Sequence, residues 1–320
     1  FSSEWYQTGK YPYENLIGGD GMQIQIDKRN PNIVFTGFQF GNYYRIDRAN
    51  NKRDYISPVQ KKGEKPFRYN WQTPILLSSH NQEILYMGSN FLHRSMNQGQ
   101  TWTAISPDLT QGAKEGNVAF GTIAAISESP LQFGLLYTGS DDGLVHVSKD
   151  GGATWNIISG NLPQNRWISR VVASAHKKER VYVTLNGYRN DDFTTYVYMS
   201  DDFGQTWINI ATNLPTSPVN VLVEDNVNED VLYLGTDNGL YVSLNKGSLW
   251  NDFSNGIPNV AVHDLVIQKK AKDLVVGTHG RSIYKVNLEP VQQLNEKVLA
   301  ENLHVFEIKK IKKSKEWGNN

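Results

Sequence analysis

The sequence of 320 residues has no cysteine and no net charge. Without cysteine it can form no disulfide framework, no Cys-ligated zinc site and no thiol nucleophile. Its 32 basic residues are balanced by 32 acidic ones, which argues against nucleic-acid binding, because that function needs a basic surface. No apolar run approaches the roughly 18 residues of a membrane helix, so we expect no membrane span.

The sequence also lacks an initiating methionine and a signal-like stretch at its first residue, Phe1. We interpret it as a mature protein or as an excerpt of a longer chain or larger assembly. A Gly-rich phosphate loop, a Gly-x-Ser-x-Gly elbow and a His-Glu-x-x-His motif are all missing from the sequence. We therefore predict no nucleotide cofactor and no metal site, with calcium as the one cofactor left open.

What the sequence does contain is a repeat. Two or three apolar residues, an aromatic, a small residue and glycine recur with steps of 42 to 51 residues. The copies lie at 34–37, 85–88, 136–139, 232–235 and 274–277, with a degenerate copy at 181–184. This period is typical of a propeller blade of four strands. The sequence therefore predicts an all-β fold, a β-propeller.

A second phrase, Ser-x-Asp/Asn-x-Gly-x-Thr-Trp, follows most copies of the first. It occurs at 95–102, 148–155, 200–207 and 243–250, with Leu249 in the threonine position of the last copy. Asp or Asn can accept backbone hydrogen bonds in such a turn, glycine supplies a left-handed backbone, and tryptophan can clamp the turn. We therefore assign a structural and not a catalytic role to four side chains: Asn97, Asp150, Asp202 and Asn245.

This second phrase resembles the Asp-box, or bacterial neuraminidase repeat, of sialidases, xyloglucanase-type glycoside hydrolases and sortilin-type receptors. Further stretches at 18–21, 70–71 and 277–281 make nearly the whole chain similar to large secreted bacterial Asp-box proteins, which are labelled glycosyl hydrolase-like or sortilin-like. The resemblance implies a propeller located outside the cytoplasm: secreted, periplasmic or at the cell surface.

The repeats divide the chain into a propeller over 1–288 and a C-terminal linker or extension over 289–320. We expect six blades, with seven as the alternative, at 19–58, 72–106, 118–159, 168–212, 217–254 and 260–287. The last blade shows three strands, and residues 2–8 could supply its missing outer strand. Helix-like spacing follows at 290–301, then a strand-like stretch at 304–308. We interpret the basic tail at 309–315 as a solvated linker, in preference to a patch for nucleic acid or anionic lipid.

Strand alternation places the loops between second and third strands, and the connectors between blades, on one face of the propeller. We expect ligand contacts on this face, where loops converge on the central channel. The candidate ligand-binding residues are Gln39, Trp71, Asn90, Asp141, Asp142, Trp167, Arg189, Asp237, His263 and Arg281, and the candidate catalytic residues are Asp20, Asp264 and His279.

Several of these residues have a structural interpretation as well. His263, Asp264 and His279 could form a metal or acid/base site, or hydrogen-bonded turns, and the turn interpretation is favoured. Asp141 and Asp142 could help to bind calcium, although their spacing favours solvated turns. Trp71 and Trp167 could stack on sugars or pack between blades.

Glycosidase chemistry needs two carboxyl groups at a controlled separation. Gln39 occupies the position of the catalytic Asp in the Thr-Asp-x-Gly-Gly-x-Tyr-Arg phrase of the xyloglucanase-type enzymes, and an amide cannot act as general acid or base. A sialidase needs an arginine triad, and no local motif joins the available arginines. We therefore favour a secreted or surface module that binds glycan or peptide. The alternative is a sialidase- or xyloglucanase-like glycoside hydrolase or a lyase.

Overall fold

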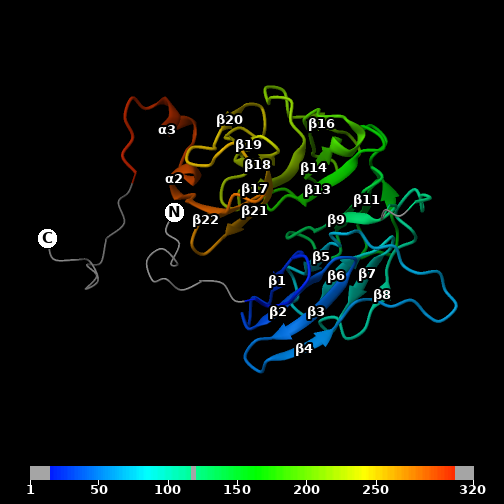
Figure 1. Cartoon of the computed structure of the whole chain (residues 1–320). Helices are drawn as coiled ribbons and strands as arrows, with labels where there is room; N and C mark the ends of the chain where they lie inside the picture. Colours follow the sequence, from blue (N-terminus) through cyan, green and yellow to red (C-terminus); the bar gives the residue numbers. More distant parts are fainter. Residues whose placement is uncertain (1–14, 117–119, 307–320) are drawn as a thin grey trace.

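The computed structural model describes residues 15–116 and 120–306 and confirms the predicted fold. The described chain forms a six-bladed β-propeller, in which six antiparallel sheets follow one another around a ring (Figure 1). Five sheets have four strands, and each sheet runs in chain order from its first strand outward. The residues proposed from sequence to close the ring, 2–8, lie outside the described part.

The strands fall inside the ranges expected for each blade, except that the first strand of blade four begins at Trp167, one residue before its expected range. Blades one and two comprise β1 (Gln25–Ile26), β2 (Ile33–Phe38), β3 (Asn42–Asp47), β4 (Lys52–Tyr55), β5 (Ile75–Leu77), β6 (Leu85–Gly88), β7 (Leu92–Ser95) and β8 (Thr103–Ala104). Blades three and four comprise β9 (Ile123–Glu128), β10 (Leu136–Ser140), β11 (Val145–Ser148), β12 (Asn156–Ile157), β13 (Trp167–Ala173), β14 (Val181–Asn186), β15 (Tyr196–Ser200) and β16 (Ile208–Asn209).

Blades five and six complete the ring. They comprise β17 (Val219–Glu224), β18 (Leu232–Thr236), β19 (Gly239–Ser243), β20 (Trp250–Asp252), β21 (Val262–Gln268), β22 (Asp273–Thr278) and β23 (Ile283–Asn287). The helical spacing after blade six corresponds to two short helices, α2 (Glu289–Gln292) and α3 (Glu296–Ala300), and the Asn295 side chain caps α3 by accepting from the Val298 N–H at 3.0 Å. Residues 304–306 form no strand, and the rest of the predicted strand lies outside the described residues.

The glycine that ends the first repeated phrase lets the next blade approach closely. A Cβ added to Gly139 would lie 2.3 Å from a side-chain carbon of Ile168, on the first strand of blade four. Gly88 meets Ile123 and Gly235 meets Val262 in the same way, at 2.9 Å and 2.6 Å. In these three blades the glycine thus sets the blade-to-blade spacing, because a larger residue there would push the neighbouring sheet away.

The second phrase forms a closed turn in blades two to five and fastens each of these blades to the one before it. In blade four, Asp202 accepts hydrogen bonds from the Ser200 hydroxyl, the Thr206 N–H and the Thr206 hydroxyl at 2.6–2.9 Å. Trp207, which follows, donates its indole N–H to the backbone carbonyl of Ile158 in blade three. Gly204 packs against that same Ile158. The turn therefore makes hydrogen bonds both within blade four and across its junction with blade three.

Buried glutamates join alternate pairs of blades. Glu128 in blade three accepts hydrogen bonds from the Ser78 hydroxyl and the Tyr86 hydroxyl in blade two, at 2.7 Å and 3.0 Å. Two blades further on, Glu224 accepts in the same way from Ser174 and Tyr182. Because a buried carboxylate is costly without donors, these contacts fix the relative position of the two sheets.

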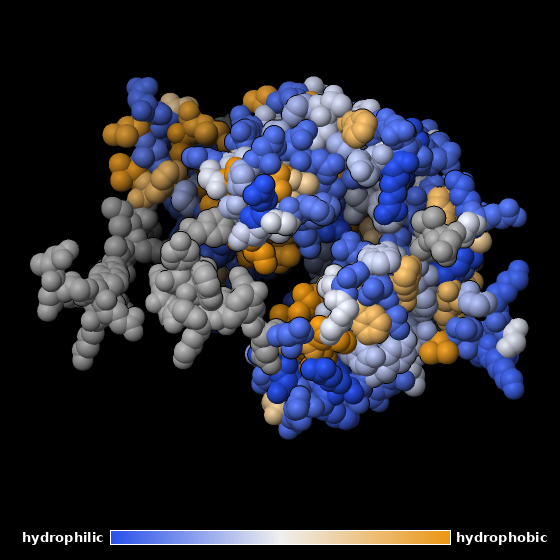
Figure 2. All heavy atoms as spheres, viewed as in Figure 1, coloured by the Kyte–Doolittle hydropathy of each residue, from blue (hydrophilic) through white to orange (hydrophobic). Residues whose placement is uncertain are grey.

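Apolar clusters fill each junction from blade one to blade six. Among the residues that the structure describes, no such cluster joins blade six back to blade one. Ile26 on blade one and Val266 and Ile283 on blade six are 50–57% exposed. Figure 2 shows apolar atoms on both sides of the opening between these blades.

Candidate functional site

A cavity of about 670 Å³ opens at the mouth of the central channel. Every blade contributes to its wall from the first strand or from the connector just before it. These contributions are Gln23, Gln72, Ala124, Trp167, Asn220 and His263, in order from blade one to blade six. The remaining wall comes from further residues of the first strands of blades four and six, and from the ends of the second strands of blades four, five and six with the loops that follow them. This is the face on which the sequence analysis placed ligand contacts.

A β-bulge in the first strand brings one extra residue into the cavity from each of four blades. The register of blade four shifts between Ile168 and Arg170, which leaves Ser169 unpaired. Asn220 and His263 occupy the same position in blades five and six, and Ala124 does so in blade three. All four residues line the cavity. Bulges redirect a side chain out of the strand alternation, and here they repeatedly direct it to the channel.

Six residues proposed from the sequence meet in this cavity. They are Trp167, Arg189, Asp237, His263, Asp264 and His279. Sequence reasoning did not name Arg170 and Asn220 as site residues, although both line the wall. A β-bulge does not change the amino-acid composition of a strand. In the sequence, Arg170 and Asn220 are therefore distinguished only by their position near the start of a first strand.

The blade-four side of the cavity is aromatic and cationic. Arg189 lies over the ring of Trp167, with 4.2 Å between its guanidinium carbon and the ring centroid. Tyr188 beside it is 60% exposed and meets Phe193 edge to face, with ring centroids 6.3 Å apart. A cation over an indole and an open tyrosine ring are groups that can bind a ligand's charge and its apolar face.

The loop that carries these residues is held by Asp192. Its carboxylate accepts from the Arg166 guanidinium at 2.7 Å and from the Tyr196 hydroxyl at 2.9 Å. Burial alone would raise the pKa of Asp192, but the hydrogen bonds from Arg166 and Thr194 outweigh it and hold that pKa well below its usual range. The carboxylate therefore stays charged and keeps the loop in place at neutral pH.

A chain of amides leads from blade four to blade five. The Asn186 side-chain amide donates to the Asn220 carbonyl oxygen at 2.9 Å, and the Asn220 amide donates to Asp237 at 2.8 Å. Asn186 in turn accepts from the backbone N–H of Tyr188 at 3.0 Å. These contacts fix the orientation of the polar groups that line the wall.

Blade six supplies two imidazoles and a carboxylate. The rings of His263 and His279 lie 5.1 Å apart, and Asp264 accepts from the Arg170 guanidinium of blade four at 2.5 Å. This ion pair joins the first strand of blade four to the first strand of blade six. Desolvation by the surrounding wall, and then the neighbouring His279, lower the pKa of His263. His263 is consequently a neutral hydrogen-bonding group at neutral pH.

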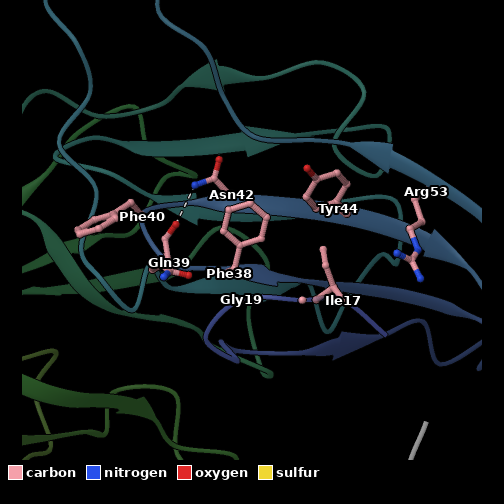
Figure 3. Close-up of a pocket in the computed structure, with 9 residues that line it drawn as sticks. Ile17, Gly19, Phe38, Gln39, Phe40, Asn42, Tyr44 and Arg53 are labelled. Atoms are coloured by element: carbon pink, nitrogen blue, oxygen red, sulfur yellow. Dashed lines mark hydrogen bonds between the residues drawn. The ribbon is translucent and has the colours of Figure 1, made fainter. Parts of the chain in front are cut away.

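A separate concavity of about 770 Å³ on blade one is lined by another predicted residue, Gln39 (Figure 3). The Gln39 amide donates to the Asp20 carboxylate and accepts from the Asp20 N–H, both at 3.3 Å. Phe38, Phe40 and Tyr44 line the same concavity. The two candidate catalytic carboxylates, Asp20 and Asp264, are therefore not brought to one place.

Trp71 lies close to that concavity. It is 48% exposed and meets Phe40 edge to face, with ring centroids 5.0 Å apart. Arg281 is exposed and lines neither cavity.

The remaining predicted residues are internal. Asn90 is buried and donates to Asp108 at 2.9 Å. Asp141 accepts from the Thr122 hydroxyl at 2.6 Å, and burial raises its pKa. Asp142 is 1% exposed and accepts from the Ser140 hydroxyl and the Gln111 N–H. The oxygens that were considered for calcium are thus engaged by donors inside the protein.

No three His, Asp or Glu side chains in the described ranges 15–116 and 120–306 are grouped so as to hold a metal ion. Within those same ranges, no helix is long and apolar enough to cross a membrane.

Comparison of whole folds places the chain beside propellers of larger proteins. It superposes on the GH74 enzyme of Niastella koreensis with a TM-score of 0.62, at 19% identity over 83% of this chain and 45% of that one. For the GH74 xyloglucanase of Xanthomonas campestris the TM-score is 0.55, at 18% identity over 73% and 38% of the two chains. For the extracellular domain of a putative hybrid two-component system, BT4673 of B. thetaiotaomicron, the TM-score is 0.54, at 15% identity over 83% of this chain and 31% of that one.

This chain therefore spans less than half the length of each of these three proteins. At such identities the likeness concerns the fold alone. A comparison with curated protein sequences finds no match. The model of one family, described as the DUF6242 beta propeller domain, matches residues 76–284, from the first strand of blade two to the last strand of blade six. The chain belongs to the DUF6242 beta-propeller domain family.

Proposed function

We propose that this chain is a glycan-binding module that holds its ligand in the cavity at the mouth of the channel. The observation that carries the proposal is the convergence of wall residues from every blade, with a β-bulge residue from each of four blades, around an open space of about 670 Å³. Binding sites are concave, with aromatic surface and a few oriented polar groups, and this cavity has both.

The side chains favour a sugar over a peptide. Tyr188 offers an open ring on which the C–H face of a sugar can stack. Asn186 and Asn220 are held by their own hydrogen bonds, so their remaining donor and acceptor capacity is already oriented for hydroxyl groups. A peptide is the second ligand class, and the same experiment distinguishes it.

We also propose a location outside the cytoplasm, secreted, periplasmic or on the cell surface. The Asp-box resemblance of the Ser-x-Asp/Asn-x-Gly-x-Thr-Trp turns supports it. One of the similar folds is by its title an extracellular domain, and two others are GH74 enzymes, which accords with a polysaccharide ligand.

The test is a glycan array followed by titration calorimetry with the full chain. We expect binding to a limited set of glycans and at least tenfold weaker binding by Tyr188→Ala. Tyr55→Ala is the matched control, since Tyr55 is also about half exposed but lies on the outer strand of blade one. Binding to peptides alone, or equal affinity for both variants, would refute the proposal.

One observation favours a second function, a glycoside hydrolase or lyase. Asp237 and Asp264 line the same cavity as the two imidazoles of His263 and His279. A digestion screen of polysaccharides, with reducing ends and unsaturated products measured separately, tests it. Product release that is lost in Asp264→Asn and Asp237→Asn would establish catalysis, whereas binding without release would leave the module non-catalytic.

A further inference from the structure

The charges of the cavity are unevenly paired. Arg170 is neutralised by Asp264, with 2.5 Å between the donor nitrogen and the carboxylate oxygen. Asp237 accepts from the Asn220 amide. His263 and His279 add no negative charge at any pH. The cation that is left, Arg189, has an aromatic ring as its neighbour in place of a carboxylate.

Arg189 is positioned to receive an anionic group. No carboxylate in the described residues lies within ion-pair distance of it, and its guanidinium lies over Trp167 at 4.2 Å. A guanidinium stacked on a ring keeps its N–H edge available, and that planar edge matches the two oxygens of a carboxylate.

The loop that carries Arg189 is built to stay in place. The Asn190 N–H and the Asp192 N–H both donate to the Gly187 carbonyl, at 2.7 Å and 3.2 Å. The carboxylate of Asp192 anchors the same loop to Arg166. A charged group on a loop fixed in this way loses little conformational freedom when a ligand binds, which raises the affinity that one ion pair can supply.

From these contacts we propose that the ligand of the channel cavity is an acidic glycan, in which a uronate carboxylate pairs with the guanidinium of Arg189. The proposal rests on the glycan-binding function proposed above and names its ligand class. Tyr188, next in the chain, takes the face of the sugar ring, while the amides of Asn186 and Asn220 take its hydroxyl groups. The carboxylate contributes a charge-assisted bond that a neutral sugar cannot form.

The experiment compares matched pairs of oligosaccharides by calorimetry: oligomers of galacturonate, of glucuronate and of alginate, each with its carboxyl-reduced neutral counterpart. We expect at least one acidic oligomer to bind ten times or more tightly than its reduced form. Arg189→Gln removes that preference, Arg189→Lys retains part of it, and Arg48→Gln, at an exposed arginine outside both cavities, leaves it unchanged.

Each outcome separates this inference from the function on which it rests. Equal binding of acidic and reduced oligomers, or a preference that survives in Arg189→Gln, would overturn the uronate assignment while glycan binding stands. Binding of neither kind, together with an empty glycan array, would overturn both. Selective binding of acidic peptides in place of sugars would likewise overturn both.

Discussion

The indole N–H of Trp207 in blade four donates to the backbone carbonyl of Ile158 in blade three, across 2.7 Å. Trp155 and Trp250 make the same bond to Ile105 and Ile210, at 2.8 Å and 2.6 Å. The bond satisfies a carbonyl at a junction between blades and fixes the ring against the preceding sheet. Tryptophan is therefore needed at this position for its N–H as well as for its size.

Removing that N–H should weaken the junction. We expect Trp207→Phe to lower the free energy of unfolding by about 2 kcal/mol, because the Ile158 carbonyl loses its partner and part of the ring contact is lost. Chemical denaturation followed by fluorescence of the other tryptophans measures this. Trp71→Phe, an exposed tryptophan outside the clamps, should stay within about 0.5 kcal/mol of wild type. An equal decrease in the free energy of unfolding in the two variants would contradict a stabilising role for the Trp207 indole hydrogen bond.

The glycine of the same turn should resist substitution. Gly204 has a φ of +87°, and an added Cβ would lie 2.4 Å from the Cδ1 atom of Ile158. Gly204→Ala should therefore cost about 1–3 kcal/mol of stability through backbone strain and overpacking. Gly160→Ala is the control, since nothing lies within 4 Å of its Cβ position. Thermal unfolding of both variants decides the matter, and a stable Gly204→Ala protein would show that the junction can shift.

The turns with aspartate should make stability depend on pH. Burial alone would raise the pKa of Asp202, but hydrogen bonds from Thr206 and Ser200 lower it to about 2. A carboxyl whose folded pKa lies below its unfolded value of about 3.9 contributes stability above that value and loses it as the pH falls toward 2.

Asn97 and Asn245 occupy the same position in two other turns, so asparagine fits there. We expect Asp202→Asn to be somewhat less stable than wild type at neutral pH and to lose less stability between about pH 4 and pH 2. Melting temperatures across that range test the slope. Parallel curves for the two proteins would show that Asp202 does not contribute to the acid transition.

The protein should be destabilised when one of the buried glutamates loses an acceptor oxygen. Glu128 accepts from the Ser78 hydroxyl, the Ser79 N–H and the Tyr86 hydroxyl. In Glu128→Gln, one acceptor oxygen is replaced by an amide group that donates and that faces the same donors. We therefore expect the free energy of unfolding to fall by about 2–3 kcal/mol. Glu83→Gln, at an exposed carboxylate, should change stability by less than about 1 kcal/mol. Denaturant unfolding measures both variants, and a small effect at Glu128 would mean that the junction is hydrated.

The sequence predicted the architecture well because its signal is repeated. The phrase around Tyr86 or Tyr137 recurs once per blade, and every copy lies in a second strand, which is buried in blades one to five and partly buried in blade six. Contacts between distant positions were not predictable in the same way. Arg170 and Asp264 lie on blades four and six, and only the curvature of the ring brings them within 2.5 Å.

The sequence analysis also predicted solvent exposure for some polar residues that are buried. Asp141 and Asp142 have the composition of a solvated turn, yet both are buried and satisfied by neighbouring loops. The bulge residue Asn220 gave no signal at all, because an inserted residue changes which way a side chain points without changing the strand's composition. Predicting it requires the pairing register, which a single sequence does not contain.

The glutamate contacts make the joints of the ring unequal. Glu128 joins blade two to blade three, and Glu224 joins blade four to blade five. Among the described residues, no buried carboxylate joins blades three and four in this way, and the buried Tyr137 hydroxyl at that joint has no partner. Under a mechanical load applied along the chain, we therefore expect the joint between blades three and four to yield before its two neighbours.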